Sequence, residues 1–492
     1  MKGKKIVSTL LALLLLASLP VSAHAATWDI GKGDITVNAG SGGQTVTQGG
    51  GAAIPDSAPV ITGTSKENNV TINADSGQTA SVTLSGVNID VRDKGKAAVS
   101  TTGEGNVSIE LNGGSTLRSG YEHAGLEKNN GGSLTIADED KNGKLTAWGG
   151  QQGAGIGGGS GKDGSNIFIT GGGVNAIGGL AAAGIGGGLG GNGSNITISG
   201  GKVGATNGLN GPGIGGGQHG SGSNITISGG EVNAIGGKSG AGIGGGHTGD
   251  GSDIIISGGE VSASGGVNGA GIGGGLRSKG NDITVSGDTK LKVRGGVEDD
   301  IDGAGAGIGD GGSNADGSRI PGAEVEPDTS GLTTNGSIEY YAPGADMEKD
   351  KPEKTTVGTL PPQEKPVEPI EPAEPEQPEA ERGMDAPLYR VTDKDGRDIV
   401  YTAERKDGVL TVNVDEDFAI LTGKLSSIDT LKRQGIEKIV FVTNKAASTF
   451  QAADLLEKGA SSDAYRLTHD GATVTFVVSE KNTDVSGILI QP

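Results

Sequence analysis

Acidic side chains at alternate positions point to metal chemistry at one place in the middle of the chain. Asp138, Asp140 and Asn142 are followed by Gly143, an order that matches the first half of an EF-hand calcium loop. The twelfth position of the loop is Gly149, where a complete site has a bidentate glutamate. The pattern leaves two interpretations open: a partial Ca²⁺ site, or a polar turn between two strands.

A second acidic cluster lies about 160 residues further on. It contains Glu298, Asp299, Asp300, Asp302 and Asp310. Carboxylates crowded on one rim repel each other, and a cation or solvent must relieve that repulsion. We therefore name Ca²⁺ as the cofactor to be expected at both clusters, with a solvated acidic turn as the alternative.

Other chemistry finds less support in the residues. The chain has no cysteine, which excludes disulfides, thiolate metal ligands and cysteine nucleophiles. His219 and His247 fall in corresponding turns of adjacent repeats, offset by one position, so they form either a shared metal site or a solvated turn. The five arginines between residues 90 and 320 occupy different repeat positions, and no Ser/His/Asp arrangement follows from spacing. We therefore expect no catalysis.

A repeat of 29 residues organises the centre of the chain. Its copies begin at Gly149, Gly178, Asn207, Gly236 and Gly265, and a further copy begins at Gly295 after one extra residue. Isoleucine and valine recur at the same phase in successive copies and alternate with polar residues, as in half-buried strands, while Gly-Gly pairs permit turns. One such coil cannot bury its own apolar face, but stacked coils can. The repeat therefore predicts a parallel β-helix.

A polar residue precedes the second strand of each coil. Stacking would align these residues and let their side chains bond along the stack. We predict a structural ladder of Asn166, Asn195, Asn224, Asp253 and Asp282.

Composition limits the partners and the compartment. The chain has 492 residues, 98 of them glycine, and a formal net charge of -20, which disfavours binding to nucleic acid. Residues 1–25 have three lysines, a short apolar run and Ala23-His24-Ala25, the pattern of a secretory signal peptide. That apolar run is too short to span a membrane, and no later segment is continuously apolar.

The remaining segments are assigned by composition and alternation. We predict an N-terminal cap over residues 26–59, the β-helix with roughly nine coils over 60–325, and an acidic Pro/Glu-rich linker region over 326–385. Residues 386–492 alternate as strands with two helical segments, Ser427–Arg433 and Phe450–Leu456, and are predicted to form a small α+β domain.

Three recurring elements carry a resemblance to a known family. These are Tyr121–Leu126, the repeated Ala-Gly-Ile-Gly-Gly-Gly, and the Ile-Thr-Ile-Ser-Gly-Gly strands. In them the chain resembles the secreted carbohydrate-binding domain proteins of clostridia and related Gram-positive bacteria. The resemblance implies an all-β, right-handed, pectate-lyase-like parallel β-helix with Ca²⁺. It also implies binding of acidic plant polysaccharide such as polygalacturonate, without catalysis.

The first functional hypothesis is therefore a secreted or cell-surface protein that binds the glycan of a cell wall, host or plant. Tyr121, Trp148 and Phe168 are the candidate residues for stacking on sugars, and packing is the alternative use of each. Two other hypotheses stay open. One is a surface adhesin or structural scaffold that binds protein, and the other is a polysaccharide lyase.

Overall fold

The computed structural model describes two separate units of the chain. The first covers residues 25–359 except 208 and 316–317, and the second covers 389–482 except 395–400, 407, 434–435, 457–462, 471–472 and 479–480. The described residues begin at Ala25, so residues 1–24 of the predicted signal peptide lie outside them. Residues 360–385 of the predicted linker also lie outside them. Among the described residues, no helix is both long and apolar enough to cross a membrane.

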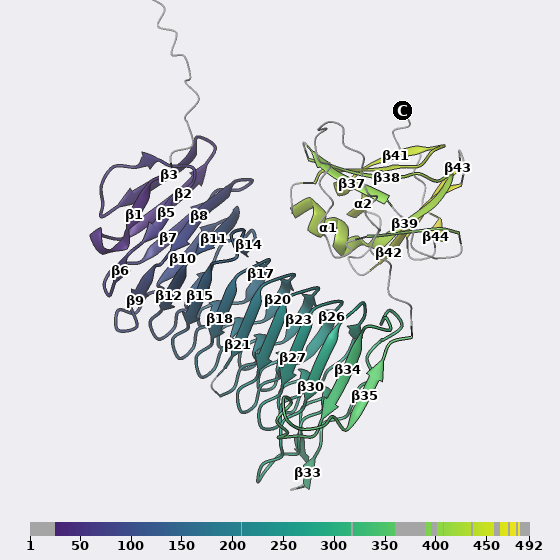
Figure 1. Ribbon diagram of the computed structural model, residues 1–492. Helices are drawn as coiled ribbons and strands as arrows, with labels where there is room; N and C mark the ends of the chain where they lie inside the picture. Colours follow the sequence, from purple (N-terminus) through teal and green to yellow (C-terminus); the bar gives the residue numbers. More distant parts are fainter. Residues whose placement is uncertain are drawn as a thin grey trace, which may run out of the picture. The chain divides into compact units, whose positions relative to one another are not determined.

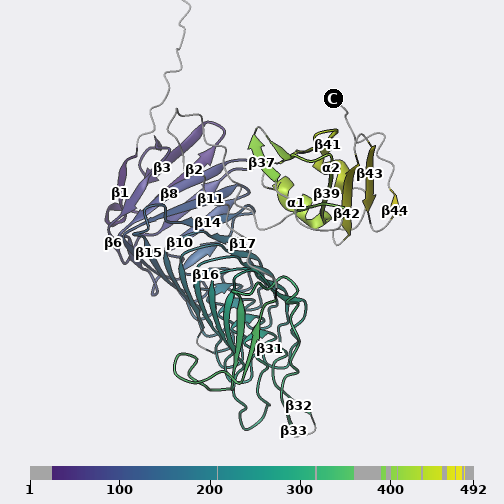
Figure 2. The same ribbon diagram turned by 45° about the vertical axis from the view of Figure 1, so that its right-hand side comes forward.

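The first unit is a parallel β-helix, as predicted, whose coils stack in sequence order (Figure 1). Each full coil contributes one strand to each of three sheets, and Figure 2 shows the same stack turned by 45°. Sheet A is formed by β1 (Thr27–Asp29), β5 (Val60–Thr62), β8 (Thr79–Ser85), β11 (Asn106–Asn112), β14 (Leu134–Ala137), β17 (Gly164–Ile169), β20 (Gly193–Ile198), β23 (Gly222–Ile227), β26 (Gly251–Ile256) and β29 (Ile283–Val285).

The other two sheets follow the same order along the stack. Sheet B is formed by β2 (Ile35–Gly40), β7 (Val70–Ala74), β10 (Val99–Gly103), β13 (Leu126–Lys128), β16 (Ile156–Gly157), β19 (Ile185–Gly186), β22 (Ile214–Gly215), β25 (Ile243–Gly244), β28 (Ile272–Gly273) and β31 (Ile308–Gly309). Sheet C is formed by β6 (Thr64–Ser65), β9 (Asn88–Asp90), β12 (Gly114–Arg118), β15 (Lys144–Trp148), β18 (Gly173–Ile177), β21 (Lys202–Thr206), β24 (Glu231–Ile235), β27 (Glu260–Ser264), β30 (Lys290–Arg294) and β34 (Ser337–Tyr341).

Residues one repeat apart pair directly and form the core. Ile156 pairs with Ile185 in sheet B, and Ile167 pairs with Ile196 in sheet A. All four are fully buried, and the alternate residues of the sheet A strands face outward. Glycine is needed where coils approach closely: Gly186 has φ +132°, and a Cβ there would lie 2.0 Å from the carbonyl oxygen of Gly215. The glycine content of the repeat thus reflects the close stacking of its corners.

The predicted polar ladder is confirmed for its three asparagines, whose side chains bond along the stack, whereas Asp253 and Asp282 bond to Ser252 and Asn281 beside them. Asn166, Asn195, Asn224, Asp253 and Asp282 all adopt left-handed backbone conformations, with φ between 51° and 56°. Asn195 Nδ2 donates to Asn166 Oδ1 at 3.0 Å, and Asn224 Nδ2 donates to Asn195 Oδ1. Asn and Asp tolerate this conformation better than other side chains, which explains why the repeat uses them at this position.

Both ends of the β-helix differ from the predicted boundaries. β1 and β2, inside the predicted cap, already pair in parallel with β5 and β7, and only β3 (Gly43–Gln48) and β4 (Ile54–Pro55) add antiparallel strands. A short 3-10 helix, η1 (Ile30–Lys32), joins β1 to β2. At the other end, β34 pairs in parallel with β30 and buries Ile338. Residues 326–357 are thus the last part of the solenoid rather than linker.

The C-terminal end of the β-helix closes with antiparallel strands. β35 (Lys354–Val357) pairs with β34 and is the last strand of sheet C. β32 (Ser313–Ala315) and β33 (Ser318–Ile320) form an antiparallel hairpin that lies between β31 and β34 in the sequence.

In its described residues, the second unit contains two sheets and two short helices, consistent with the α+β prediction. One sheet is formed by β36 (Arg390–Thr392), β39 (Phe418–Lys424), β42 (Ala464–Asp470), β43 (Thr473–Val478) and β44 (Lys481–Asn482); the other is formed by β37 (Tyr401–Lys406), β38 (Val409–Val414), β40 (Lys438–Val442) and β41 (Ala447–Gln451). The helices are α1 (Leu425–Arg433) and α2 (Ala452–Leu456). The predicted helix Phe450–Leu456 is present as α2, but it begins two residues later, because Phe450 and Gln451 belong to β41, where Phe450 pairs with Ile439 and is buried.

A buried lysine marks the change from the long sheet B strands of the first coils to the two-residue strands of the repeats. Lys128 lies opposite Thr101 on β10, and its Nζ donates to the carbonyl oxygen of Asn130 at 2.7 Å. Burial lowers the pKa of Lys128 to about 8. Because this pKa is lower in the folded protein than in the unfolded chain, the charge destabilises the fold below about pH 8, and stability rises as the pH increases toward 10.5.

We therefore expect Lys128→Met to increase the free energy of unfolding at pH 7 by about 2 kcal/mol, since the removed charge penalty exceeds one lost hydrogen bond. The free energy of unfolding of this variant should also no longer rise between pH 8 and 10. Denaturant unfolding at several pH values measures both effects, and Lys144→Met, at an exposed position of β15, is the control. A variant less stable than the parent at pH 7 would contradict this account.

Candidate functional site

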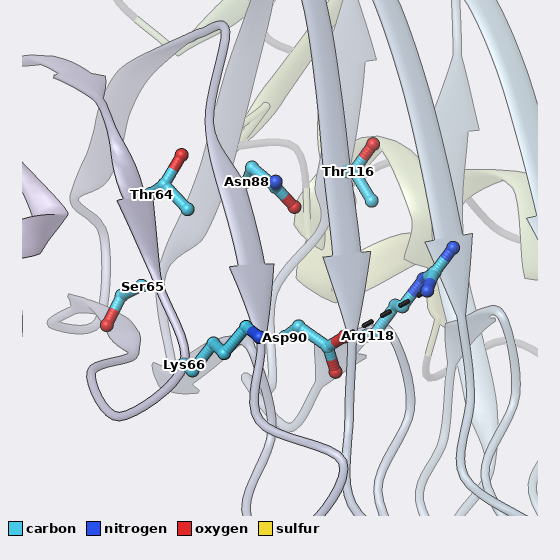
Figure 3. Close-up of a pocket in the computed structure, with 7 residues that line it drawn as sticks. All are labelled: Thr64, Ser65, Lys66, Asn88, Asp90, Thr116 and Arg118. Atoms are coloured by element: carbon cyan, nitrogen blue, oxygen red, sulfur yellow. Dashed lines mark ion pairs between the residues drawn. The ribbon is translucent and has the colours of Figure 1, made fainter.

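A polar groove on the outer face of sheet C is the candidate functional site (Figure 3). Its volume is about 300 Å³. Its lining comes from three neighbouring strands and the residue after the first: Thr64, Ser65, Lys66, Asn88, Asp90, Thr116 and Arg118. We call this set the sheet C groove.

Strand alternation places the strand side chains of this set outside, except Ser65, which pairs with Ile89 and is buried. Ile89 and Leu117 point inward and are fully buried, so their neighbours in β9 and β12 face solvent. The register then aligns equivalent positions: Thr64 pairs with Asn88, and Asn88 pairs with Thr116. Hydroxyl and amide groups thus form one outward row across three coils.

Three charged residues, Asp90, Arg92 and Arg118, lie beside this row. Asp90 accepts bonds from Arg92 Nε at 2.9 Å and Arg92 Nη2 at 2.6 Å, and Arg118 Nη1 lies 3.9 Å from Asp90 Oδ2. The hydrogen bond from Arg92 is the main reason why the pKa of Asp90 is lowered, so this carboxylate stays ionised. Two of the seven lining residues are cationic, Lys66 and Arg118, and one, Asp90, is anionic. The groove is therefore locally basic on an acidic protein.

Arg118 combines an aromatic contact with an unused donor. Its guanidinium carbon lies 4.2 Å from the ring centroid of Trp148, its neighbour on β15. Its Nε is buried and has no hydrogen-bond partner in the part of the chain that the structure describes. A ligand carboxylate or hydroxyl at the groove would give the Arg118 guanidinium further partners.

The three predicted aromatic residues do not form one platform. Trp148 lies beside the groove, next to Arg118. Tyr121 is half exposed in the turn that follows β12, with its hydroxyl 3.3 Å from Gln152 Nε2. Phe168 faces outward on sheet A between Thr135 and Thr197, on a different face from Trp148.

The prediction that the five arginines occupy different repeat positions was wrong for Arg118 and Arg294, which lie in one row of sheet C. Arg92 and Arg118 converge on Asp90 although they belong to different coils. Asp90, Arg118 and Trp148 are separated by 28 and 30 residues, close to the repeat length of 29, and pair at one position of sheet C. Extending the repeat into the irregular early coils could have revealed this alignment.

In the first predicted calcium cluster, side-chain oxygens accept backbone hydrogen bonds that stabilise a turn. Asp138 Oδ1 accepts hydrogen bonds from the backbone amides of Asn142, at 3.1 Å, and Gly143, at 3.0 Å. Asn142 Oδ1 accepts from the amide of Gly113 in the neighbouring coil, and Asp140 lies in the same turn. This geometry matches the polar-turn alternative.

The second cluster is likewise divided among separate partners. Both oxygens of Asp302, which is buried, bind Arg277 at 2.9 and 3.0 Å. Asp299 accepts from the amides of Ile301 and Asp302, and Asp310 accepts from the amide of Gly280, while Asp300 lies in the same loop. Nowhere in the described ranges do three His, Cys, Asp or Glu side chains gather around one position that could hold a metal. Among the described residues, the predicted ligands are thus held by backbone amides and by Arg277 rather than gathered around one point.

The second unit contains a Ser/His contact that has no access to a substrate. Ser448 Oγ lies 2.8 Å from His469 Nε2, and Thr443 Oγ1 lies 3.2 Å from His469 Nδ1. Ser448 and His469 are buried, and burial lowers the pKa of His469 to about 4. The arrangement stabilises the core and leaves the imidazole neutral.

Comparison with known families agrees with this architecture. Residues 141–160, 196–218, 225–247 and 254–276 match the family model described as a β-helix repeat. The chain is a parallel β-helix protein. Comparison with curated proteins and with solved structures gives no match. β-Helix repeats are found in polysaccharide-acting proteins and in adhesins, and pectate lyases share the β-helix fold.

The contacts of Asp302 predict how this β-helix protein responds to calcium. Asp302→Ala should lower the free energy of unfolding by about 2 kcal/mol, because Arg277 loses two charge-assisted bonds. The loss should be equal with Ca²⁺ and with chelator, as measured by denaturant unfolding. If Ca²⁺ stabilised the parent protein and not the variant, Asp302 would be a calcium ligand and the assignment would be wrong.

Proposed function

We propose that the protein is a secreted, non-catalytic binder of an acidic polysaccharide, held along the outer face of sheet C. The observation that carries the proposal is the basic sheet C groove, with Arg118 stacked on Trp148, on a chain whose net charge is -20. A uronate carboxylate can bind the Arg118 guanidinium and Lys66, and a sugar ring can lie against Trp148.

The repeating surface suits a repeating polymer. The polar row continues beyond the groove, since Thr116 pairs with Thr146 and Thr146 with Asn175. Neighbouring positions in such a row are about 4.8 Å apart. An extended glycan lying along these coils would meet a hydroxyl or amide group at each position from Thr64 to Asn175, where Gly204 then interrupts the row. The two cationic side chains would select an acidic glycan.

The groove also lacks the groups that hydrolysis of a glycoside normally uses. Two carboxyl groups must flank the bond that is cleaved. Asp90 is the one carboxylate among the lining residues, and Arg92 holds it ionised. We therefore propose binding without hydrolysis, at the surface of a Gram-positive cell or at a host or plant wall. Ca²⁺ has no part in the proposed contacts.

Affinity electrophoresis and calorimetry with polygalacturonate, its methyl-esterified form and neutral glycans test the proposal. We expect binding of polygalacturonate that weakens with salt, survives chelator and is lost on esterification, because the carboxylates carry the attraction. Arg118→Met should weaken binding roughly tenfold. Arg294→Met is the matched control, since Arg294 occupies the same row of sheet C at the other end of the stack.

Three results would contradict the proposal. These are no retention of any acidic glycan, equal affinity for the esterified polymer, or equal loss in the Arg118 and Arg294 variants. Ultraviolet absorbance of unsaturated sugar products, followed in the same samples, would identify a lyase instead.

A further inference from the structure

Two imidazoles from neighbouring coils meet in the turns between sheets B and A. His219 follows β22, and His247 follows β25. Their ring centroids are 5.6 Å apart, with the rings tilted by 52°. This pair is separate from the sheet C groove, and the proposed glycan binding does not use it.

His219 has a left-handed backbone conformation, which usually favours glycine. One position has a left-handed conformation in successive coils, and Gly161 and Gly190 occupy it with φ 69° and 74°. The next coils place His219, Thr248 and Arg277 there, with φ between 60° and 67°. A side chain in this conformation costs about 1 kcal/mol relative to glycine. Polar side chains nevertheless occupy this position in three successive coils.

The contacts of His219 define where its proton lies. Its Nε2 is 3.0 Å from Gln218 Nε2, an amide nitrogen that only donates, so Nε2 is the acceptor. Nδ1 therefore carries the proton and donates to Thr248 Oγ1 at 2.7 Å. A metal-binding imidazole has this arrangement: one nitrogen keeps a lone pair, and the other donates to an oriented oxygen.

His247 supplies a second imidazole. Its Nδ1 is buried without a hydrogen-bond partner among the described residues. His219, Arg277 and Asp302 are the titratable or charged groups that act on this ring. The nearby Arg277 charge is balanced by its two bonds to Asp302.

We propose that His219 and His247 together bind one divalent transition-metal ion, with Cu²⁺ bound more tightly than Zn²⁺. Imidazole nitrogen is a favoured ligand of both ions, and Cu²⁺ stands above Zn²⁺ in general affinity for nitrogen sites. Gln218 would release His219 Nε2, and solvent would complete the coordination.

Calorimetry with Cu²⁺ and Zn²⁺, and electron paramagnetic resonance of the Cu²⁺ complex, test this site in the full protein. We expect one Cu²⁺ per chain, with hyperfine coupling to two imidazole nitrogens. Two fold-preserving variants come from neighbouring coils: His219→Gly copies Gly190, and His247→Leu copies Leu189 and Leu276. Each should weaken Cu²⁺ binding at least about tenfold. His123→Asn, at a histidine paired with Glu127, should leave it unchanged.

The variants are chosen so that loss of Cu²⁺ binding can be distinguished from loss of folding. His219→Gly should melt at or above the parent temperature because it removes the backbone penalty, so its loss of Cu²⁺ would not reflect unfolding. Parent protein that binds no more Cu²⁺ than a variant combining His219→Gly and His247→Leu would overturn the proposal. Coupling to a single nitrogen, or loss of binding in His123→Asn, would overturn it as well.

Discussion

Parallel pairing of each coil with the next is the constraint on which the rest of the β-helix depends. It places residues one repeat apart side by side, and the inward ones are committed to the core, as Ile156 and Ile185 are. Chemistry is then confined to outward strand positions and turns. Both sites follow from this, because Asp90 meets Arg118, and His219 meets His247, from neighbouring coils.

The fold could be predicted where the repeat is regular. Isoleucine and valine at a fixed phase indicate stacked strands, and asparagine before the strand indicates a ladder, since few other residues tolerate that backbone. The ends could not be placed in this way. A terminal coil has a neighbour on one side only, so Trp28 and Ile338 complete the core without following the repeat.

The groove was harder to predict than the fold. Trp148 was recognised by its type, but Arg118 was missed, because the early coils vary in length and conceal which residues align. The two acidic clusters show a different difficulty. A backbone amide and a cation compete for the same carboxylate oxygen, and spacing alone does not distinguish them. At Asp138 the amides occupy one oxygen, and at Asp302 an arginine occupies both.

The central claim is that an acidic glycan lies on the outer face of sheet C, with its carboxylate at Arg118. A crystal structure of the protein with an oligogalacturonate tests this most directly. The account predicts a sugar carboxylate within hydrogen-bond distance of the Arg118 guanidinium and a ring over or beside Trp148. An oligosaccharide bound on sheet A or sheet B, with the sheet C groove empty, would contradict it.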